Sequence, residues 1–282
     1  MSIIDAIILG VIEGIAEFLP ISSTGQLTII EKLMGYRIDD PGIMAFTAII
    51  QIGATLAAVG YFREGIIPLS SAWLKGLFNV KLRQELDYKM GWCVIIGSVP
   101  VAIVGLLIKD HIEMALRSLW FVVAGLILWS IVLLLADRSN AKMGKRVRKE
   151  SQVTWKDTLF IGVMQCLALI PGISRSGATI SGGLFRGLDR VTAVRLSFFL
   201  GMPVLLSAGL LEVVTKADDI SSGIGWAPTI IGMLTSFIVG YFSISWLLKF
   251  VSTHSFSLFI WYRVAVGLLI SGLILTGVIG AI

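Results

Sequence analysis

Two stretches of this chain, 152 residues apart, share an unusual pattern: an apolar segment is interrupted by Pro and Gly and then continues with hydroxyl-bearing residues. Aligned without gaps, the stretches 10–26 and 162–178 match at Gly10/Gly162, Val11/Val163, Ala16/Ala168, Ile21/Ile173, Ser22/Ser174 and Gly25/Gly177. Broken, polar backbone at membrane depth is tolerated only where protein or a cavity satisfies its hydrogen bonds. Because paired interruptions in the two halves of a membrane protein point to a binding site, the duplication predicts one here.

The composition excludes an ordinary soluble domain. Of 282 residues, 56% are hydrophobic and only 15% are charged, whereas soluble proteins average about 25% charged residues. The apolar residues form long blocks, which predicts membrane helices rather than the alternating strands of an outer-membrane barrel. The net charge of +5 lies mostly in loops, so we attribute it to orientation in the membrane and expect no nucleic-acid partner.

Six segments are long enough to cross a bilayer, which takes about 20 residues. They are 42–62, 90–108, 118–136, 196–215, 227–248 and 264–281. Two further apolar regions, 2–35 and 158–186, are too long for one span and too short for two, and each is broken near its middle. We therefore predict an all-α polytopic membrane protein with six transmembrane helices and two re-entrant helix hairpins.

The basic residues indicate how these spans are oriented. The predicted loops 63–89, 137–157, 186–195 and 249–263 hold 17 of the 23 Lys and Arg residues. The opposite side holds five: Lys32, Arg37, Lys109, Arg117 and Lys216. The positive-inside rule puts the richer side in the cytoplasm. The remaining basic residue, Arg175, falls inside the second hairpin.

This layout predicts an inverted repeat. Residues 1–136 would form the first copy, a hairpin (2–35) plus three spans, and residues 158–282 the second copy, a hairpin (158–186) plus three spans. Because three is odd, the copies have opposite orientations and their hairpin tips meet near the midplane. Residues 137–157 would be a basic cytoplasmic linker beside anionic lipid.

Two carboxylates, Glu13 and Glu17, lie four residues apart on one face of the first half-helix. A charged carboxylate at membrane depth costs about 2.5–3.5 kcal/mol even on the translocon insertion scale, so such residues are usually functional. They could coordinate a divalent cation, act as acid and base, or pair with Arg175. The alternative is a structural ion-pair network that ties the repeats together.

Each hairpin tip also carries candidate anion-binding residues. These are Ser22, Ser23, Thr24 and Gly25 in the first tip, and Ser174, Arg175, Ser176 and Gly177 in the second. Hydroxyls can simply cap a helix, but backbone N–H groups at a helix start also bind anions, and an Arg can hold phosphate through two hydrogen bonds. Together the tips supply oxyanion clamps, a nucleophile and carboxylates, which suits phosphoryl chemistry. Because carboxylates repel a diphosphate, we also expect a bridging divalent cation, Mg²⁺ or Ca²⁺, at Glu13 and Glu17.

These motifs resemble those of the undecaprenyl-diphosphate phosphatase family, also called the bacitracin-resistance proteins. The family motif E-G-x-x-E-F-x-P-V-S-S-T-G-H corresponds to residues 13–26, and P-G-x-S-R-S-G-A-T corresponds to residues 171–179. Weaker similarity at 46–53, 99–112 and 262–263 extends the resemblance over nearly the whole chain.

The resemblance implies hydrolysis of a polyprenyl diphosphate lipid to the monophosphate and inorganic phosphate at the outer face of the bacterial plasma membrane. This would recycle the lipid carrier of cell-wall synthesis and confer bacitracin resistance. Carried over to this chain, Glu13 and Glu17 would bind metal or exchange protons, and Ser23 would be a candidate nucleophile. Arg175 would clamp the diphosphate with Ser174 and Ser176. The attacking group is either Ser23 or a water molecule. The partners to be tested include a second copy of the chain in a homodimer.

One position departs from the family pattern, because Gln26 stands where the family usually has His. Glutamine donates and accepts hydrogen bonds but cannot shuttle a proton near neutral pH. We count Gln26 among the substrate-binding residues of the first tip. A proton-transfer role there would have to pass to Glu13, Glu17 or a metal-bound water; the alternatives are a reduced activity or binding alone. We expect Gln26→His to be tolerated or to raise turnover.

The main alternative function is a transporter or flippase for a polyprenyl phosphate lipid, since inverted repeats with broken helices are typical of secondary transporters. A second lipid-phosphatase superfamily, with the motif S-R-x5-H-x3-D, is excluded because Ser181 stands where that motif needs His. A purely structural scaffold would not need Glu13, Glu17 and Arg175 within the membrane.

Overall fold

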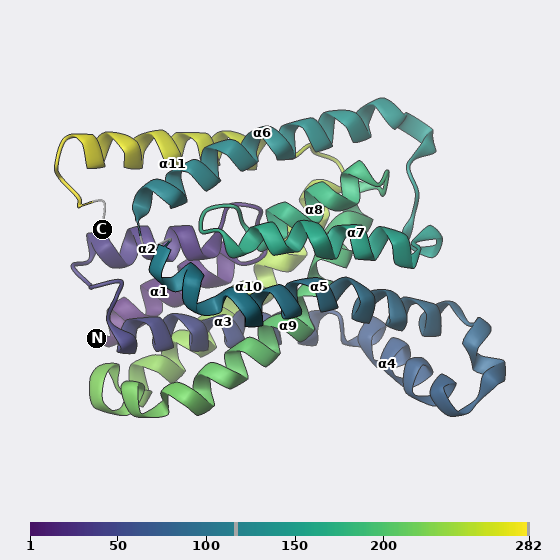
Figure 1. The fold of residues 1–282 in the computed structure, drawn as a ribbon, viewed down its shortest axis with the longest axis horizontal. Coiled ribbons are helices and arrows are strands. Elements are labelled where there is room, and N and C mark those ends of the chain that lie inside the picture. Colours follow the sequence, from purple (N-terminus) through teal and green to yellow (C-terminus); the bar gives the residue numbers. More distant parts are fainter. Residues whose placement is uncertain (116–117, 281–282) are drawn as a thin grey trace.

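The computed structural model describes residues 1–115 and 118–280, and these form a bundle of α-helices without a β-strand (Figure 1). The helices are α1 (Ile3–Ala16), α2 (Ser23–Leu33), α3 (Pro41–Tyr61), α4 (Arg63–Phe78), α5 (Leu86–Ala115), α6 (Leu119–Met143), α7 (Trp155–Cys166), α8 (Arg175–Phe185), α9 (Arg190–Asp219), α10 (Trp226–Val251) and α11 (Ser257–Leu275). Short 3₁₀ turns lie at Val80–Gln84, Gly144–Arg146, Glu150–Gln152 and Leu167–Leu169, and a π-turn at Ile220–Ile224 follows α9.

The predicted six spans are confirmed as six helices long and apolar enough to cross a membrane. Within the described residues they are Pro41–Tyr61, Leu86–Ile108, Leu119–Arg146, Arg190–Thr215, Trp226–Val251 and Ser257–Leu275. The chain is therefore an all-α, multi-pass membrane protein. The start of α1 and the end of α11 lie at one end of the molecule, and the connection between α6 and α7 lies at the other (Figure 1).

Two predicted loops contain more structure than the sequence pattern indicated. Region 63–89 holds α4, whose 16 residues include Pro68 and several charged side chains, so its helical pattern was hidden. Region 137–157 begins with the last turns of α6, and Asp137 there is buried, accepting a hydrogen bond from Arg190 Nε at 2.7 Å. Arg117, one of the basic residues assigned to the opposite side, lies outside the described residues.

Arg263 requires a correction. We counted it among the basic residues of a cytoplasmic loop, but it lies inside α11 and is fully buried. Without it the four loop regions still hold 16 basic residues against five, so the predicted orientation does not depend on it.

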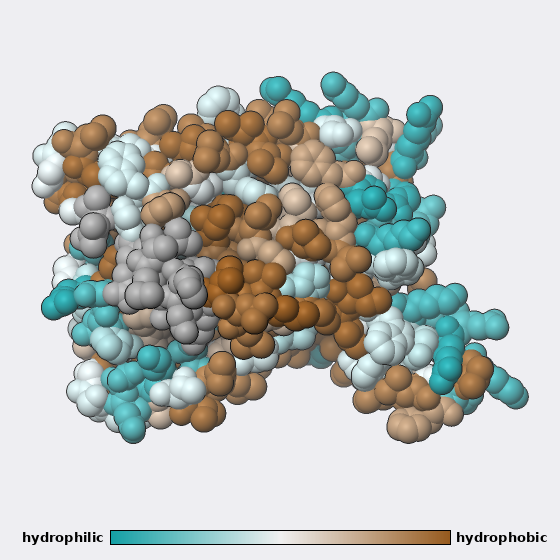
Figure 2. All heavy atoms as spheres, in the orientation of Figure 1, coloured by the Kyte–Doolittle hydropathy of each residue, from teal (hydrophilic) through white to brown (hydrophobic). Residues whose placement is uncertain are grey.

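Figure 2 shows hydrophilic side chains gathered at the end where α6 finishes and α7 begins, beside a broad apolar surface.

The two apolar regions that are too short for a pair of spans each form two short helices separated by a break. We call residues 17–22, between α1 and α2, the first break loop, and residues 170–174, before α8, the second break loop. Helices of 11–14 residues extend only about 17–21 Å at about 1.5 Å per residue, against an apolar bilayer core of about 30 Å. None of these four helices can cross the membrane alone. Their entry and exit on one membrane face remains a prediction.

Two of the short helices, α1 and α7, pack against long helices of the opposite half of the chain. Helix α1 packs on α10, and α7 packs on α5, while α3 contacts α9 and α6 contacts α11. Glycines allow close approach: a Cβ at Gly10 would lie 2.5 Å from the Gly232 carbonyl oxygen, and one at Gly162 would lie 2.1 Å from the Gly97 carbonyl oxygen. Exchanged partners are what an inverted repeat would produce, and the repeat itself remains a prediction.

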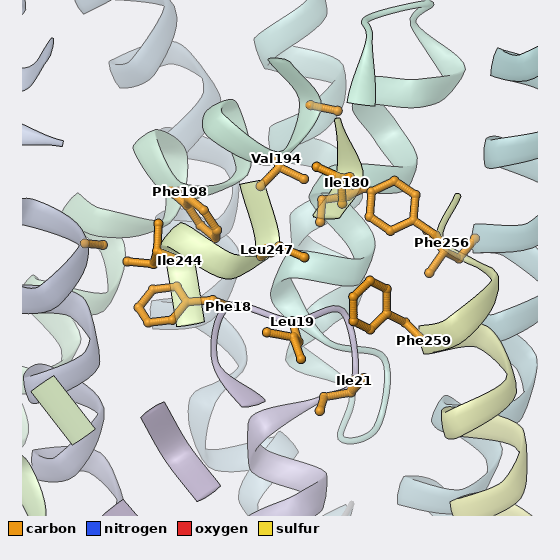
Figure 3. Close-up of a cluster of buried hydrophobic side chains, with 14 of the residues drawn as sticks. Phe18, Leu19, Ile21, Ile180, Val194, Phe198, Ile244, Leu247, Phe256 and Phe259 are labelled. Atoms are coloured by element: carbon orange, nitrogen blue, oxygen red, sulfur yellow. The ribbon is translucent and has the colours of Figure 1, made fainter. Parts of the chain in front are cut away.

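The first break loop is anchored in the largest hydrophobic cluster. Phe18, Leu19 and Ile21 point into it, with side chains from α8, α9, α10 and α11 around them (Figure 3). Phe18 meets Phe198 edge to face, with ring centroids 5.3 Å apart. At membrane depth, where lipid is as apolar as these side chains, close van der Waals packing fixes the loop, and the polar residues on either side of it are left to form a site.

The linker between the halves is held by a buried carboxylate rather than lying wholly in solvent. Arg148 donates two hydrogen bonds to Asp157 at the start of α7, at 2.9 and 2.8 Å, and Arg186 Nε donates to the same side chain at 2.7 Å. Burial alone would raise the pKa of Asp157, but these partners and Thr154 hold it well below its usual range. Asp157 is therefore ionised and joins the linker, α7 and the end of α8.

Candidate functional site

Both break loops end in a serine that begins the next helix from a strained backbone conformation. Ser22 has φ 72° and Ser174 has φ 79°, and they are the two non-glycine residues with positive φ among residues 1–115 and 118–280. Each serine hydroxyl caps its helix by accepting the N–H of Gly25 (3.3 Å) or Gly177 (3.1 Å). Such a conformation costs of order 1–3 kcal/mol and is typical of functional sites, where surrounding structure enforces it.

Glu17, at the end of α1, is the centre of the polar contacts. Its Oε1 accepts a hydrogen bond from Arg175 Nη2 at 2.9 Å, which pairs a carboxylate of the first half with a guanidinium of the second. Its Oε2 accepts the Ser23 hydroxyl at 2.6 Å and the Gln51 side-chain amide at 3.2 Å. The Glu17 carboxylate is 3% exposed and the Arg175 side chain 14% exposed, so the ion pair is largely shielded from solvent.

Arg175, the first residue of α8, is held from behind by α9. Its Nη1 donates to the Ser197 carbonyl oxygen at 2.8 Å, and its Nε is buried without a partner among the described residues. The guanidinium lies directly over Gly201: a Cβ there would be 2.5 Å from Nη1 and 2.8 Å from Cζ. The missing side chain at Gly201 thus makes the space in which Arg175 faces Glu17.

Further hydrogen bonds connect the two tips. The Ser176 hydroxyl donates to the Leu19 carbonyl oxygen at 2.9 Å and lies 3.0 Å from the Ser174 hydroxyl. Thr179 Oγ1 bonds to the Ser197 hydroxyl at 2.7 Å, which ties α8 to α9 behind the guanidinium. The tips therefore meet through backbone and side-chain contacts, as we expected from the aligned breaks.

A cavity of about 180 Å³ opens between the tips. Its polar wall comprises Glu17, Ser22, Ser23, Thr24, Gln51, Gln165, Ser174 and Arg175. The other wall is apolar and includes Val101 of α5 and Val204 and Leu205 of α9. Carboxylate, hydroxyls and guanidinium therefore share one small space with an aliphatic surface, an arrangement suited to a phosphorylated lipid.

Two buried side-chain oxygens next to the tips have no hydrogen-bond partner within the part of the chain that the structure describes. One is Glu13 Oε1, in a side chain only 1% exposed, and the other is Oε1 of Gln165. Glu13 lies one helical turn before Glu17, and Gln165 occupies the corresponding position in the second half. A proton on Glu13, or a cation shared with Glu17, would satisfy the first of these oxygens.

Gln26 is directed away from the cavity. Its amide nitrogen donates to the Ile21 carbonyl oxygen at 3.1 Å, and its Oε1 accepts the Tyr262 hydroxyl at 2.9 Å. It does not line the cavity. We expected this residue to touch the substrate; the structure instead places it between the first break loop and α11, where a glutamine satisfies both neighbours.

The predicted residues thus fall into two groups. Six of them line the cavity: Glu17, Ser22, Ser23, Thr24, Ser174 and Arg175. The others lie behind it, where Ser176 joins the tips, Gly25 and Gly177 donate to the caps, and Glu13 is enclosed. The sequence reasoning did not identify Ser197 or Gly201. The alignment of the two motifs pairs Gln165 with Glu13, but we assigned Gln165 no role.

The tips offer two predicted carboxylate ligands, Glu13 and Glu17, which is fewer than a protein site built for Ca²⁺ usually has. Among the described residues no group of three or more His, Cys, Asp or Glu side chains is placed to hold a metal ion. Glu13 and Glu17 would supply two carboxylates, so the remaining ligands would have to be hydroxyls, water or substrate oxygens.

Comparisons with known proteins extend over the whole chain. A family model described as bacitracin resistance protein BacA matches residues 6–269. Undecaprenyl-diphosphatase 3 of Frankia casuarinae is 55% identical over 281 residues, covering all of both chains. Undecaprenyl-diphosphatase of Cutibacterium acnes is also 55% identical, over 288 residues and the full length of both chains. Undecaprenyl-diphosphatase 1 of Streptomyces avermitilis is 49% identical over 283 residues, covering 99% of this chain and all of the relative.

Proposed function

Because this chain belongs to the bacitracin resistance protein BacA family, we propose that it is a membrane-bound undecaprenyl-diphosphatase. It hydrolyses undecaprenyl diphosphate to the monophosphate and inorganic phosphate, and so recycles a lipid carrier and confers bacitracin resistance. Full-length relatives with this name and a cavity that combines Glu17, Ser23 and Arg175 support the proposal. The observation that carries it is the 2.6 Å hydrogen bond from Ser23 Oγ to Glu17 Oε2 opposite the Arg175 guanidinium.

Arg175 binds the terminal phosphate in this proposal. In the free protein its Nη2 is neutralised by Glu17 at 2.9 Å. An entering diphosphate offers more negative charge, so the guanidinium turns its N–H groups to phosphate oxygens, and the hydroxyls of Ser174 and Ser22 complete the anion site. The exchange releases Glu17 from its ion pair just as substrate arrives, and a carboxylate without its cation is a stronger base.

Ser23 and Glu17 form the nucleophile and base. A hydroxyl is a weak nucleophile until a neighbouring base takes its proton. Ser23 Oγ bonds to the terminal phosphorus while the bond from that phosphorus to the bridging oxygen breaks. Glu17 takes the hydroxyl proton and passes it to the bridging oxygen of the departing monophosphate.

Water completes the reaction. A water molecule attacks the phosphoserine, giving its proton to Glu17, and the bond between phosphorus and Ser23 Oγ breaks. The proton then returns to Ser23, which restores the starting state and releases inorganic phosphate. Direct attack by a water held at Glu17 gives the same products and is the alternative that the experiment below distinguishes.

A divalent cation, Mg²⁺ or Ca²⁺, fits the donor atoms near the tips. Glu13 and Glu17 would hold it, since their oxygens are the hard ligands that these ions prefer and Glu13 Oε1 has no partner among the described residues. When bound, the ion would offset the repulsion between the carboxylates and the diphosphate.

The lipid chain leaves the site along its apolar wall, where Val101, Val204 and Leu205 line the cavity. Pro100 of α5 directly precedes Val101, and Pro203 of α9 directly precedes Val204. We place the entrance of the cavity on the extracytoplasmic side, because the basic loop regions mark the opposite face as cytoplasmic.

The proposal is tested with purified wild-type protein and Ser23→Ala on undecaprenyl diphosphate carrying a labelled terminal phosphate. We expect a labelled protein to be trapped by acid quench during turnover of the wild type, and phosphate release to fall about 10³-fold in Ser23→Ala. Thr28→Ala, one turn further along α2, serves as the matched hydroxyl control, because Thr28 does not line the cavity and donates to the Thr24 carbonyl oxygen at 2.8 Å; it should retain most activity. Release without a labelled protein, and little loss in Ser23→Ala, would assign the attack to water.

A further inference from the structure

Arg263 of α11 is the largest fully buried side chain in the described part of the molecule. Within that part its hydrogen bonds go to neutral groups, four carbonyl oxygens and one hydroxyl. A buried cation is costly unless its N–H groups are satisfied, so the protein has arranged several carbonyl oxygens around this one guanidinium.

Two of those carbonyls belong to the break loops. Arg263 Nη1 donates to the Pro20 carbonyl oxygen at 3.0 Å, and Nη2 donates to the Gly172 carbonyl oxygen at 2.9 Å. Positions 20 and 172 are 152 residues apart, the same offset that aligns the two motifs. One guanidinium therefore binds the same backbone atom in each copy of the motif.

The bound carbonyls lie immediately before the strained part of each loop. Pro20 is two residues before Ser22, and Gly172 is two residues before Ser174, the two serines with positive φ. Fixing the preceding carbonyl restrains the backbone that enters the strained serine. In each copy that serine starts the helix whose first residue, Ser23 or Arg175, faces the cavity.

The guanidinium is itself fixed to α6. Its Nη2 also donates to the Gly125 carbonyl oxygen at 3.0 Å, and its Nε lies 3.2 Å from the Ser130 hydroxyl and 3.3 Å from the Leu126 carbonyl oxygen. The second loop lies against the same helix, since a Cβ at Gly125 would be 2.5 Å from the Pro171 carbonyl oxygen. Helices α6 and α11 thus form a rigid support to which both loops attach.

A second α11 side chain reaches the first loop alone. Tyr262 donates to Gln26, which donates in turn to the Ile21 carbonyl oxygen at 3.1 Å. This contact is specific to the first motif, whereas Arg263 serves both. The difference allows the two connections to be tested separately.

We propose that Arg263 is a positioning residue that sets the two break loops at a fixed distance. Glu17 and Ser23, at the two ends of the first loop, then meet the phosphate held by Arg175, which directly follows the second loop. Arg263 does not line the cavity and touches no reacting atom. The kinetic part of this inference rests on the proposed phosphatase function, while the structural part does not.

The test compares Arg263→Met and Arg263→Lys with Ile270→Ala. Ile270 is a similarly buried α11 residue, two helical turns after Arg263, in a cluster with Ile29, Leu119 and Ile279, so it controls for general loosening of α11. We expect Arg263→Met to lower kcat by about 100-fold, the loss that a displacement of roughly 1 Å can cause, with a smaller change in KM. Arg263→Lys, which keeps the charge but reaches fewer carbonyls, should fall between Met and wild type.

Amide hydrogen exchange supplies a readout that needs no activity. In Arg263→Met, exchange should rise in both loops and in the two residues that follow each, residues 17–24 and 170–176. In Tyr262→Phe it should rise only around the first loop, and in Ile270→Ala it should change around neither. Should Arg263→Met fail to fold, Arg263→Lys and Tyr262→Phe carry the same comparison. Exchange that rises only within α11, or an Arg263 variant with the kcat of Ile270→Ala, would overturn the proposal. If the variants show the expected exchange but the wild type releases no phosphate, the positioning role stands and the proposed function is rejected.

Discussion

The first break loop, residues 17–22, and the second, residues 170–174, enter their following helices in the same way. Each reaches a serine with positive φ whose hydroxyl accepts the N–H group three residues later. In each, the carbonyl two residues before that serine accepts a hydrogen bond from Arg263. The two motifs therefore share a backbone conformation and the hydrogen bonds that hold it.

The side chains that face the cavity differ between the two motifs. Glu17 and Ser23 of the first correspond to Leu169 and Arg175 of the second, and Glu13, enclosed behind the cavity, corresponds to Gln165 in its wall. One backbone arrangement thus presents a base and a hydroxyl in one copy and a cation in the other, and the cavity forms where they meet. The comparison indicates that the duplicated backbone provides geometry, while the divergence of a few side chains provides the chemistry.

The largest effect is expected when Glu17, the carboxylate of the ion pair that joins the two motifs, is replaced. Glu17→Gln deletes the base beside Ser23 and leaves Arg175 without its carboxylate partner, so phosphate release should fall about 10³-fold. Binding of a non-hydrolysable polyprenyl diphosphonate should be kept or become tighter, because the neutral amide of the variant no longer competes with the ligand for the guanidinium. Equal losses of binding and turnover would mean that Glu17 is needed for the site to form rather than for the reaction.

Filling the space around Arg175, the residue that the second motif contributes to the ion pair, should have a smaller effect. Gly201→Ala adds a methyl group within 2.5 Å of Arg175 Nη1, which must displace the guanidinium from its place opposite Glu17. We expect roughly a 10- to 100-fold loss of kcat/KM, the scale of a 1 Å misplacement. Gly60→Ala, at a helical position with nothing within 4 Å of the added methyl, is the matched control and should behave like wild type.

The shared backbone can be tested at both serines in parallel. Replacing Ser22 or Ser174 by Ala removes the cap and keeps the unfavourable φ, at a cost of about 1 kcal/mol of stability. Glycine also removes the cap but relieves the strain, so the Gly variants should unfold at a higher temperature than the Ala variants. Thermal unfolding in detergent gives the order at each site. Opposite orders at Ser22 and Ser174 would show that the loops do not share this strain.

The smallest effect is expected at the position where the chain departs from its family. Because Gln26 faces Ile21 and Tyr262 rather than the cavity, Gln26→His should fold and keep activity close to wild type, with a neutral imidazole able to donate to one neighbour and accept from the other. The pH profile of kcat/KM should also stay in place. A new ionisation in that profile would indicate that residue 26 acts on the reaction directly.

The sequence predicted the six spans and the paired breaks because both are local properties of the chain: block hydropathy, and Pro and Gly at matching positions. It failed where position in space decides the outcome. Arg263 was assigned to a loop because it lies close to one in sequence, yet its partners are 91 to 243 residues away. Helix α4 was missed because Pro68 and flanking charges interrupt its pattern.

Much of the candidate site could also be predicted, since Glu17, Ser23 and Arg175 are unusual residues for a membrane segment. Their neighbours could not. Nothing in the sequence around Gly201 indicates that its missing side chain makes room for a guanidinium from another helix. Likewise, the direction of Gln26 depends on Tyr262, 236 residues later.

The most direct test of the central claim, that the two loops join to form one phosphatase site, is phosphate release from undecaprenyl diphosphate by purified protein in detergent, with and without Mg²⁺ or Ca²⁺. A flippase cannot act without a bilayer, so release in detergent separates the two functions. The account predicts metal-stimulated release by the wild type and by Arg37→Ala, because Arg37 forms an exposed ion pair with Asp39 and does not line the cavity. It predicts a loss of about 10³-fold or more in Arg175→Gln. No release by the wild type, or Arg175→Gln as active as wild type, would contradict it.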